Sequence, residues 1–458
     1  MNVAEITRQL FSELEKRGIR YCIYNGYEYL PNEVKSDLDI AIEKRAFKDL
    51  DYIIYKCSEN NNSIVLHKIW HDPWRIAYII SPLYIEKPYS LQLDFFGEFT
   101  LRDYKKNNTI LRYLILEEDE LLLERNKKDY FYIPSPYLEF FVKLTTMIFK
   151  ASYSQEKFAK ILELYQNEKN KAQDLIIRFF QNLSLEICSN LEKNNFEWFE
   201  KNRDILIKAL KTNKFKYLTP SRIFLSVKMI IHRILRPVGM TITFLGPDGC
   251  GKSAIVNKTA ELLSKSFHGR SLFYWRPELL KQPGVAFGLR EDTKTDNPNP
   301  HDLQPEPSIK SSFRFLYYLF DFVIGYILKV YPLKIKKHLC IFDRYYYDVL
   351  VDKKRYNLSL PTFILKLPLP LIPKPDITFI LDVPPQELYK RKQELPLSEL
   401  ERQRNLFLSL AKKLPNAIII DNNRSLKESL NEITYKILST KSYKTRGILK
   451  IKEDHTKK

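Results

Sequence analysis

The stretch "TITFLGPDGCGKS", residues 241–253, places three glycines within six positions of a chain that has only 12 glycines among 458 residues. These glycines follow an apolar run and directly precede Lys252 and Ser253. The spacing fits the pattern G-x-x-x-x-G-K-[ST], and the residues after it have apolar side chains at helical intervals. A strand, a glycine-rich loop and a helix in this order predict a loop whose backbone N–H groups surround a phosphate.

This loop predicts a nucleoside-triphosphate site with ATP and Mg²⁺ as cofactors. In such a loop the lysine lies on the β- and γ-phosphates, and the serine hydroxyl binds Mg²⁺. We therefore expect Lys252 to be catalytic and Ser253 to be a metal ligand. The residues predicted to bind the nucleotide are Gly246, Pro247, Asp248, Gly249, Cys250, Gly251, Lys252, Ser253 and Ala254.

Two more apolar strands follow downstream. The first, in "HLCIFDRYYYDVL", ends at Asp343, and Arg344 comes next. An acid at the end of such a strand is placed to organise Mg²⁺, and the arginine beside it offers a planar fork for an anion. The second, Ile377 to Leu381 in "DITFILDVPPQELYKRKQEL", leads into a helix that carries Arg391.

In combination, "GPDGCGKS", "DRYYYD" and "LDVPPQELYKRK" resemble the thymidylate kinase family of nucleoside-monophosphate kinases, over roughly residues 241–440. The resemblance implies a P-loop kinase that transfers the γ-phosphoryl group of ATP to a small acceptor, and kinases of this type are often dimers. It implies catalytic roles for Lys252, Asp343, Arg344 and Arg391. Arg344 would hold the acceptor, Asp343 would serve the metal, and Arg391 would be a lid arginine.

Other positions of this sequence match the family's motifs less closely. Arg402 and Arg404 are further lid candidates, and Arg276 in "FYWRPELL" would grip the acceptor phosphate. Two stretches depart from the family's pattern. Residues 282–307 are long, polar and proline-rich, which fits a substrate loop or a surface insertion. "RYYYDVLVDKKRYN" has extra aromatic and basic residues that suit a larger acceptor, so a nucleoside monophosphate and a sugar or sugar phosphate both stay open.

A second set of acids lies in the N-terminal part. In "SDLDIAIE", Asp37 and Asp39 point to the face opposite the apolar side chains, and "LQLDFFGEF" repeats this alternation with Asp94. Three carboxylates from two strands predict a site for divalent metals that promotes attack on a nucleotide α-phosphate. The alternative is a solvated strand face without chemistry.

The acids in "NGYEYLPNEVKSDLDIAI" resemble the nucleotidyltransferase superfamily that includes aminoglycoside nucleotidyltransferases and β-type polymerases, over about residues 5–215. In that superfamily a Gly-Ser pair usually opens the helix before the acids, whereas here Tyr27 follows Gly26. This departure weakens the prediction of catalysis more than the prediction of the fold. Between the strands, "VLHKIWHDPWRI" supplies two histidines and two tryptophans. These residues are His67, Trp70, His71 and Trp74. They fit either a metal or base-stacking patch or aromatic packing, and we favour aromatic packing.

The patterns predict an α/β multidomain chain. We expect an α+β nucleotidyltransferase-like domain at 1–130 and a helical subdomain with a linker at 131–236. A parallel sheet flanked by helices, the P-loop kinase, follows at 237–440, and a frayed basic tail at 441–458. The leading hypothesis is the kinase with a second, N-terminal active site. The runner-up makes the N-terminal acids the working site and the P-loop domain regulatory.

A net charge of +19, from 74 Lys and Arg against 55 Asp and Glu, suits polyanionic partners or merely reflects a basic surface. A nucleic-acid-binding regulatory protein is the third hypothesis, supported by the basic amphipathic segment 222–236. The five scattered cysteines indicate a reducing, cytoplasmic compartment. The apolar window 315–333 contains Asp321 and Lys329, which predicts a buried core helix rather than an integral membrane segment, with peripheral membrane contact left open.

Overall fold

The structure, a computed structural model, describes residues 1–35, 37–102, 113–213, 220–281 and 307–449. The chain forms two compact units, and each is described by itself. Unit 1 comprises residues 1–81, 91–232 and 444–458, and unit 2 comprises residues 82–90 and 233–443.

Unit 2 contains a five-stranded sheet in which every neighbouring pair of strands is parallel, in the order β11-β12-β10-β13-β14. The strands are β10 (Met240–Leu245), β11 (Gly269–Phe273), β12 (His338–Asp343), β13 (Ile377–Asp382) and β14 (Ala417–Asp421). Strand β10 is buried along its whole length, as expected for a central parallel strand covered on both faces. The predicted parallel sheet is confirmed.

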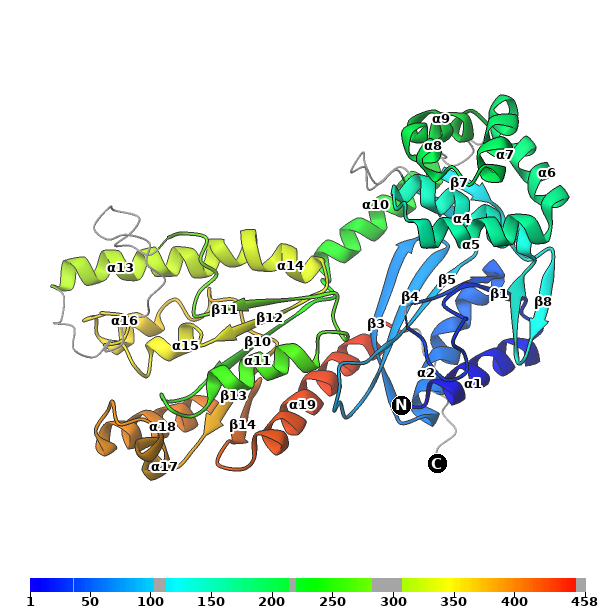
Figure 1. Cartoon of the computed structure of the whole chain (residues 1–458). Helices are drawn as coiled ribbons and strands as arrows, with labels where there is room; N and C mark the ends of the chain where they lie inside the picture. The colour runs from blue at the N-terminus through cyan, green and yellow to red at the C-terminus, as the bar shows by residue number, and fades with distance from the viewer. Residues whose placement is uncertain (36, 103–112, 214–219, 282–306, 450–458) are drawn as a thin grey trace. The chain divides into compact units, whose positions relative to one another are not determined.

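Helices cover both faces of this sheet, with α13 and α14 on one side and α11 and α19 on the other (Figure 1). Their bounds are α11 (Lys252–Leu262), α13 (Ser308–Phe320), α14 (Tyr331–Ile335), α15 (Tyr346–Val349), α16 (Thr362–Lys366), α17 (Pro385–Arg391), α18 (Leu397–Ala411) and α19 (Leu426–Arg446). A π-helix (Asp321–Val330) joins α13 to α14. Because parallel strands end at the same edge, the loops after β10, β12 and β13 meet there.

The apolar window 315–333 is only half buried, which corrects the expectation of a buried core helix. One face packs in the core of unit 2 through Phe315, Phe322, Tyr326 and Val330. The other face exposes large apolar side chains: Leu316, Phe320, Ile327 and Leu328. A helix in the outer layer of a sheet presents one side to the strands and the other to solvent. Within the described ranges, no helix combines the length and the apolarity needed to cross a membrane.

Unit 1 contains a mixed five-stranded sheet in the order β1-β2-β5-β4-β3. The strands are β1 (Tyr21–Asn25), β2 (Leu38–Ile42), β3 (Ser63–Asp72), β4 (Arg75–Pro82) and β5 (Leu91–Phe96). Strands β2 and β5 are parallel neighbours, and their register pairs Asp39 with Asp94. Helices α1 (Val3–Lys16) and α2 (Leu50–Asn60) belong to the same unit and contact each other.

A layer of helices covers the sheet face that carries Ala41 and Phe96, since both side chains belong to the same buried core as the helices. These helices are α4 (Pro136–Lys150), α5 (Gln155–Asn167), α6 (Lys169–Phe180), α7 (Ser184–Glu192), α8 (Phe196–Lys201) and α9 (Arg203–Asn213). Asp39 and Asp94 each precede one of these core residues by two positions, so they lie on the same sheet face. The predicted helical segment after residue 135 is present.

Further elements lie outside these two sheets and the helices named above. Strand β6 (Phe99–Leu101) pairs with β7 (Tyr113–Leu116), β8 (Arg125–Lys128) pairs with β9 (Phe131–Pro134), and two more helices are α3 (Glu118–Leu121) and α10 (Pro220–Leu235). The predicted frayed tail begins later than expected, because α19 continues through Arg446. Thr445 is buried, and its hydroxyl donates to the carbonyl of Leu66 at 2.6 Å, which holds this last turn in place.

Candidate functional site

The P-loop, residues 246–253, lies between the end of β10 and the start of α11. Its three glycines have φ angles of 152°, 80° and 89°. A Cβ atom on Gly246 would lie 2.9 Å from the carbonyl oxygen of Leu381, and a Cβ on Gly251 would lie 3.1 Å from the side-chain nitrogen of Asn422. Positive φ angles and these close contacts explain why a glycine-poor chain has three glycines here.

Lys252 and Ser253 are held at the start of α11. The buried ammonium of Lys252 donates to the carbonyls of Gly246 and Pro247, both at 2.8 Å, and so lies inside the loop. The Ser253 hydroxyl lies 3.4 Å from Oδ2 of Asp343, at the end of the neighbouring strand β12. Oδ1 of Asp343 is buried and has no hydrogen-bond partner among the described residues. The P-loop serine and the strand-end acid are therefore brought together, as the sequence predicts.

Asp248 connects the P-loop to two arginines. One carboxylate oxygen contacts Arg344, and the other contacts Arg355. Lys252 lies 3.9 Å away from the first oxygen. Burial opposes ionisation of Asp248, but these three cations outweigh it and hold the pKa of the carboxyl well below its usual range. Asp248 is therefore a carboxylate at neutral pH.

Arg344 is fixed from two sides. Besides Asp248, its guanidinium donates to Oδ2 of Asp348 at 3.0 Å. Asp348 has no exposed surface, and the hydroxyl of Tyr356 donates to it at 2.6 Å. Arg344 also has a φ of 82°, in the left-handed region that a non-glycine residue seldom adopts. A buried acid and an unusual backbone conformation thus aim this guanidinium at the P-loop.

Charge also affects Asp343. Burial raises the pKa of its carboxyl, while Lys252 and Arg344 act in the opposite direction. A further cation bound beside Asp343 would favour the ionised form of this carboxyl, because opposite charges attract.

The predicted lid arginines take different positions. Arg391 is exposed at the end of α17, next to the P-loop, since a Cβ on Gly249 would lie 3.9 Å from the Cβ of Arg391. Arg404 makes a bidentate ion pair with Asp382, at 2.6 and 2.9 Å. Arg402 makes a similar pair with Glu399, both contacts at 2.7 Å. Of the three arginines, Arg391 is the one that these distances place beside the P-loop.

Arg276 is engaged in its own loop. Its guanidinium forms an ion pair with Asp321, which has no exposed surface, and donates to the carbonyl of Leu280 at 2.8 Å. Asp321 also accepts backbone N–H bonds from Leu279 at 2.8 Å and from Leu280 at 3.2 Å. These contacts give Arg276 a structural task, and its grip on the acceptor phosphate stays a prediction. The predicted substrate loop 282–307 lies, except for Pro307, outside the described residues.

Sequence reasoning did not single out three residues that join this site. Arg355 contacts Asp248, Asp348 holds Arg344, and the side chain of Asn422 donates to the carbonyl of Cys250 at 2.6 Å. Asn422 directly follows β14, so its place at the end of a parallel strand was the available signal. Nothing in the spacing of "DVLVDKKRYN" reveals the contact between Arg355 and Asp248.

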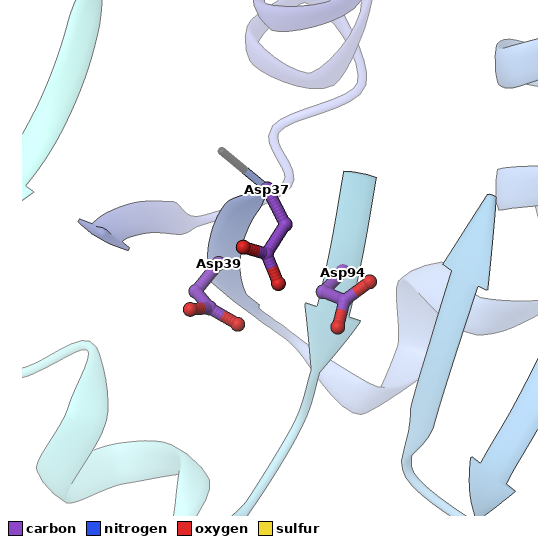
Figure 2. Close-up of side chains that lie close together, drawn as sticks. All are labelled: Asp37, Asp39 and Asp94. Carbon is purple, nitrogen blue, oxygen red and sulfur yellow. The ribbon is translucent and has the colours of Figure 1, made fainter. Parts of the chain in front are cut away.

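The second predicted site is also brought together. Ligand oxygens of Asp37, Asp39 and Asp94, here called the acid triad, all lie within 4.8 Å of one another. Figure 2 shows the three carboxylates converging from the start of β2 and from β5. The pairing of Asp39 with Asp94 on neighbouring parallel strands causes this proximity. Oxygen ligands in this number and spacing suit a hard divalent cation.

Arg75 lies beside the acid triad at the start of β4. Its guanidinium is 3.4 Å from Asp39 and 3.6 Å from Asp94. The side-chain amide of Gln92 donates to Asp94 at 3.0 Å. Burial raises the pKa of Asp39 to about 6, Arg75 opposes that rise, and the carboxylates of Asp37 and Asp94 add to it.

The loop before the triad requires a glycine. Gly26 has a φ of 83°, and a Cβ there would lie only 2.3 Å from the backbone oxygen of Asp37. The tyrosine after it is buried, and its hydroxyl donates to Glu139 on α4 at 2.8 Å. Tyr27 therefore ties the loop to the helical layer.

The histidine and tryptophan segment forms aromatic contacts. The ring of Phe47 stacks on Trp70 with centroids 6.1 Å apart and meets Trp74 edge-on at 5.7 Å. His67 is buried. Among the described residues, the acid triad is the group of potential metal ligands that lies close enough to share an ion, and it includes neither His67 nor His71. These contacts favour the packing interpretation of this segment.

Of the comparisons with known proteins, the match to a family model supports part of the predicted thymidylate kinase resemblance. The thymidylate kinase family model matches residues 300–433, which include β12, β13 and β14 but not the P-loop. Among solved structures, a thymidylate kinase from Ehrlichia chaffeensis is similar, with 22% sequence identity, a TM-score of 0.30, and coverage of 44% of this chain and 98% of that chain. The search of curated proteins found no match. Residues 300–433 thus carry a thymidylate kinase domain match, and it contains Asp343, Arg344 and Arg391.

Proposed function

We propose that unit 2 is an ATP-dependent phosphotransferase that transfers the γ-phosphoryl group of ATP to a small acceptor. The acceptor is a nucleoside monophosphate, a sugar or a sugar phosphate. The observation that carries this proposal is that Ser253 lies beside Asp343 and that Lys252 and Arg344 both lie beside Asp248 of the same loop. The family match over residues 300–433 supports the same reaction class.

The residues fit Mg²⁺. Oδ1 of Asp343 is a buried oxygen without a hydrogen-bond partner in the described part of the chain, and the Ser253 hydroxyl lies beside the other oxygen of that carboxylate. Hard oxygen ligands of this kind suit Mg²⁺. Asp343 and Ser253 would hold the ion, which when bound neutralises charge on the triphosphate.

The chain's own residues supply binding and charge. The N–H groups of the P-loop and the start of α11 receive the triphosphate, and Lys252 contacts its outer phosphates. An anionic acceptor oxygen, or a hydroxyl oxygen that releases its proton to water, attacks the γ-phosphorus. The bond from that phosphorus to the β–γ bridging oxygen breaks, and ADP leaves with the electron pair. Arg391, beside the loop, neutralises the moving phosphoryl group, and positioning with charge neutralisation lowers the barrier.

On the acceptor side we place Arg344. Its guanidinium is oriented by Asp348 and lies against Asp248. Arg355, on the other oxygen of Asp248, adds a second cation at the same place. Two guanidinium groups so close together suit an acceptor that carries an anionic group.

ATP turnover by the full chain, measured against a panel of nucleoside monophosphates, sugars and sugar phosphates, tests this proposal. We expect one acceptor class to raise ADP formation, and Lys252→Ala to abolish the rise. The matched control is Lys258→Ala on the same helix, where the lysine is exposed and paired with Glu261 at 2.7 Å. A rise that survives Lys252→Ala, or no acceptor-dependent turnover although ATP binds, would refute the proposal and favour a regulatory P-loop.

The acid triad favours a second candidate function, nucleotidyl transfer in unit 1. Three carboxylates within 4.8 Å could hold divalent metal for attack on a nucleotide α-phosphate, with pyrophosphate as the leaving group. The mixed sheet with a helical layer over the acid-bearing face is compatible with the nucleotidyltransferase resemblance.

The test is release of pyrophosphate from nucleoside triphosphates in the presence of Mg²⁺ or Mn²⁺, again with the acceptor panel. Asp37→Asn should abolish it, whereas Asp119→Asn, a change at an acid whose side chain is 92% exposed, should not. Equal pyrophosphate release by wild type and Asp37→Asn would remove this function.

A further inference from the structure

Two buried polar atoms on the acceptor side of unit 2 have no hydrogen-bond partner among the described residues. They are Nε of Arg344 and Oδ1 of Asp348, and the two side chains are 7% and 0% exposed. Both residues are engaged through other atoms. The guanidinium donates to Oδ2 of Asp348 at 3.0 Å, and the hydroxyl of Tyr356 donates to the same oxygen at 2.6 Å. Because an unmatched buried donor or acceptor costs free energy, this pair of atoms suits a ligand group that satisfies both.

The two atoms need opposite partners. The N–H of Arg344 needs an acceptor, whereas Oδ1 of Asp348 needs a donor. A hydroxyl group supplies both, but the oxygens of an ionised phosphate only accept and are repelled by a carboxylate. The indole N–H of Trp275 is another buried donor without a partner in the described part of the chain, and Trp275 stacks on Tyr356 with centroids 4.1 Å apart. A molecule with several hydroxyl groups therefore matches this side of the site.

The charges around these atoms favour the same kind of acceptor. Arg344 contacts Asp248 and Asp348. Arg355 contacts Asp248 and Asp352, so three acids surround two arginines. A phosphate as the attacking group would bring further negative charge to this set, whereas a hydroxyl group is neutral. The guanidinium groups remain suited to an anionic group elsewhere on the acceptor.

The location of the pair distinguishes a sugar hydroxyl from the edge of a nucleobase, which also donates and accepts hydrogen bonds. Arg344 directly follows Asp343, whose Oδ2 lies 3.4 Å from the hydroxyl of Ser253 in the P-loop. Asp248, the other partner of Arg344, belongs to the P-loop itself. The pair therefore lies next to the site of phosphoryl transfer. In a nucleoside monophosphate the sugar separates the base from the attacking phosphate, so the base edge would lie away from this site.

We infer that unit 2 phosphorylates a hydroxyl group of a sugar or a sugar phosphate rather than the phosphate of a nucleoside monophosphate. This acceptor class rests on the phosphotransferase function proposed above. The hydroxyl next to the attacking one donates to Oδ1 of Asp348 and accepts from Nε of Arg344. The attacking oxygen bonds to the γ-phosphorus, and its proton passes to water. The bond from that phosphorus to the β–γ bridging oxygen breaks, ADP leaves with the electron pair, and the product is a phosphate ester of the sugar.

Product analysis with the full chain tests the acceptor class. Purified protein is incubated with ATP, Mg²⁺ and, in separate reactions, hexoses, pentoses, their monophosphates and nucleoside monophosphates, and phosphorus NMR identifies each product. The highest kcat/KM should belong to a sugar or sugar phosphate. Its product should give a phosphate ester signal without coupling to a second phosphorus, and Lys252→Ala should abolish that signal.

Two results would overturn this acceptor class. A higher kcat/KM for a nucleoside monophosphate, with the coupled phosphorus signals of a diphosphate product, would overturn it and leave the phosphotransferase function intact. Absence of turnover with every acceptor would refute both. Wild type alone decides between these results, so the test does not depend on the folding of a variant.

Deoxy analogues of the sugar that turns over test the hydroxyl contact. Wild type should lose at least about tenfold in kcat/KM when the hydroxyl next to the attacking one is absent, because buried polar groups are left without partners. Asp348→Asn keeps the shape of the side chain but removes its charge, and it should reduce this discrimination at least about threefold. Equal discrimination by wild type and a folded Asp348→Asn would overturn the contact.

Arg355 distinguishes the sugar phosphate from the unphosphorylated sugar. If the acceptor is a sugar phosphate, Arg355→Gln should lower the ratio of its kcat/KM to that of the parent sugar about tenfold. A wild type that prefers the parent sugar identifies the sugar instead. The matched control is Arg270→Gln, an exposed arginine near the start of β11 that donates to the carbonyl of Ala260 at 2.9 Å. It should keep the wild-type ratio, and circular dichroism with thermal unfolding checks that all variants fold.

Discussion

The P-loop site of unit 2 and the acid triad of unit 1 balance charge differently. Around the P-loop, Asp248 contacts Arg344 and Arg355, and Asp348 contacts Arg344 from the other side. In the triad, three carboxylates lie within 4.8 Å, and Arg75 contacts two of them at 3.4 and 3.6 Å.

This difference indicates the charge of the ligand that each site suits. The alternating acids and arginines of unit 2 hold guanidinium groups in fixed orientations, which suits an anionic ligand. In unit 1, burial and, to a smaller extent, the carboxylates of Asp37 and Asp94 raise the pKa of Asp39, and a divalent cation would favour its ionised form.

The largest expected effect separates the two sites. Lys252→Ala should lower acceptor-dependent ATP turnover about a hundredfold or more, because it removes a cation from the transferring phosphates. It should change pyrophosphate release less than about twofold, since Lys252 is neither a member of the acid triad nor among the residues described as contacting it. Asp39→Asn should have the reverse pattern. Both activities are assayed in parallel on both variants. A single variant that abolishes both activities would contradict the conclusion that the two sites work independently.

The second prediction concerns stability. Arg344→Met should lower the free energy of unfolding by about 3 kcal/mol, because breaking a buried pair leaves Asp348 without its cation. Arg402→Met is the control, since this arginine is 49% exposed in its pair with Glu399 and should cost less than about 1 kcal/mol. Urea denaturation followed by fluorescence measures both. Equal losses in the two variants would show that the Arg344 network is not a special source of stability.

The third prediction addresses the loop before the triad. Gly26→Ala should cost about 2 kcal/mol or more, because it combines a positive φ with a clash at 2.3 Å against the oxygen of Asp37. Gly18→Ala, at a φ of 63° with no neighbouring atom within 4 Å, should cost only about 1 kcal/mol. Thermal and urea unfolding of both variants compare them. The same loss in each would mean that close contact at Asp37 is unimportant.

The smallest expected effect depends on pH. The pKa of Asp248 is lower in the folded chain than in the unfolded chain, so its ion pairs stabilise the fold above about pH 4, the unfolded value. That contribution is lost as the pH falls toward the folded pKa. Asp248→Asn should therefore destabilise the protein at pH 7, and the difference from wild type should shrink on acidification. Unfolding midpoints across this pH range measure the difference, and a gap that widens in acid would contradict the assigned sign.

Much of the site in unit 2 was predictable because it depends on local spacing. The P-loop is one contiguous stretch, and Arg344 directly follows the strand that ends at Asp343. Parallel strands then bring the ends of β10 and β12 to one edge. Two members of the acid triad were predictable for the same reason, since strand alternation places Asp37 and Asp39 on one face. The pairing of β2 with β5, which brings Asp94 beside them, is a tertiary contact. Arg276 shows the limit: its pattern indicates an anion grip, but a buried partner 45 positions later, Asp321, engages the guanidinium.

The sequence by itself determined the P-loop, the strand that ends at Asp343 and the alternation of Asp37 and Asp39, because backbone conformation and strand alternation act over a few neighbouring residues. Only the tertiary structure decided the partners of the charged groups. Arg355 reaches Asp248 from 107 positions away, and Arg222 reaches Glu98 from 124. Such contacts depend on how separate elements pack, and a long flexible side chain carries no local signal of where its charge will end.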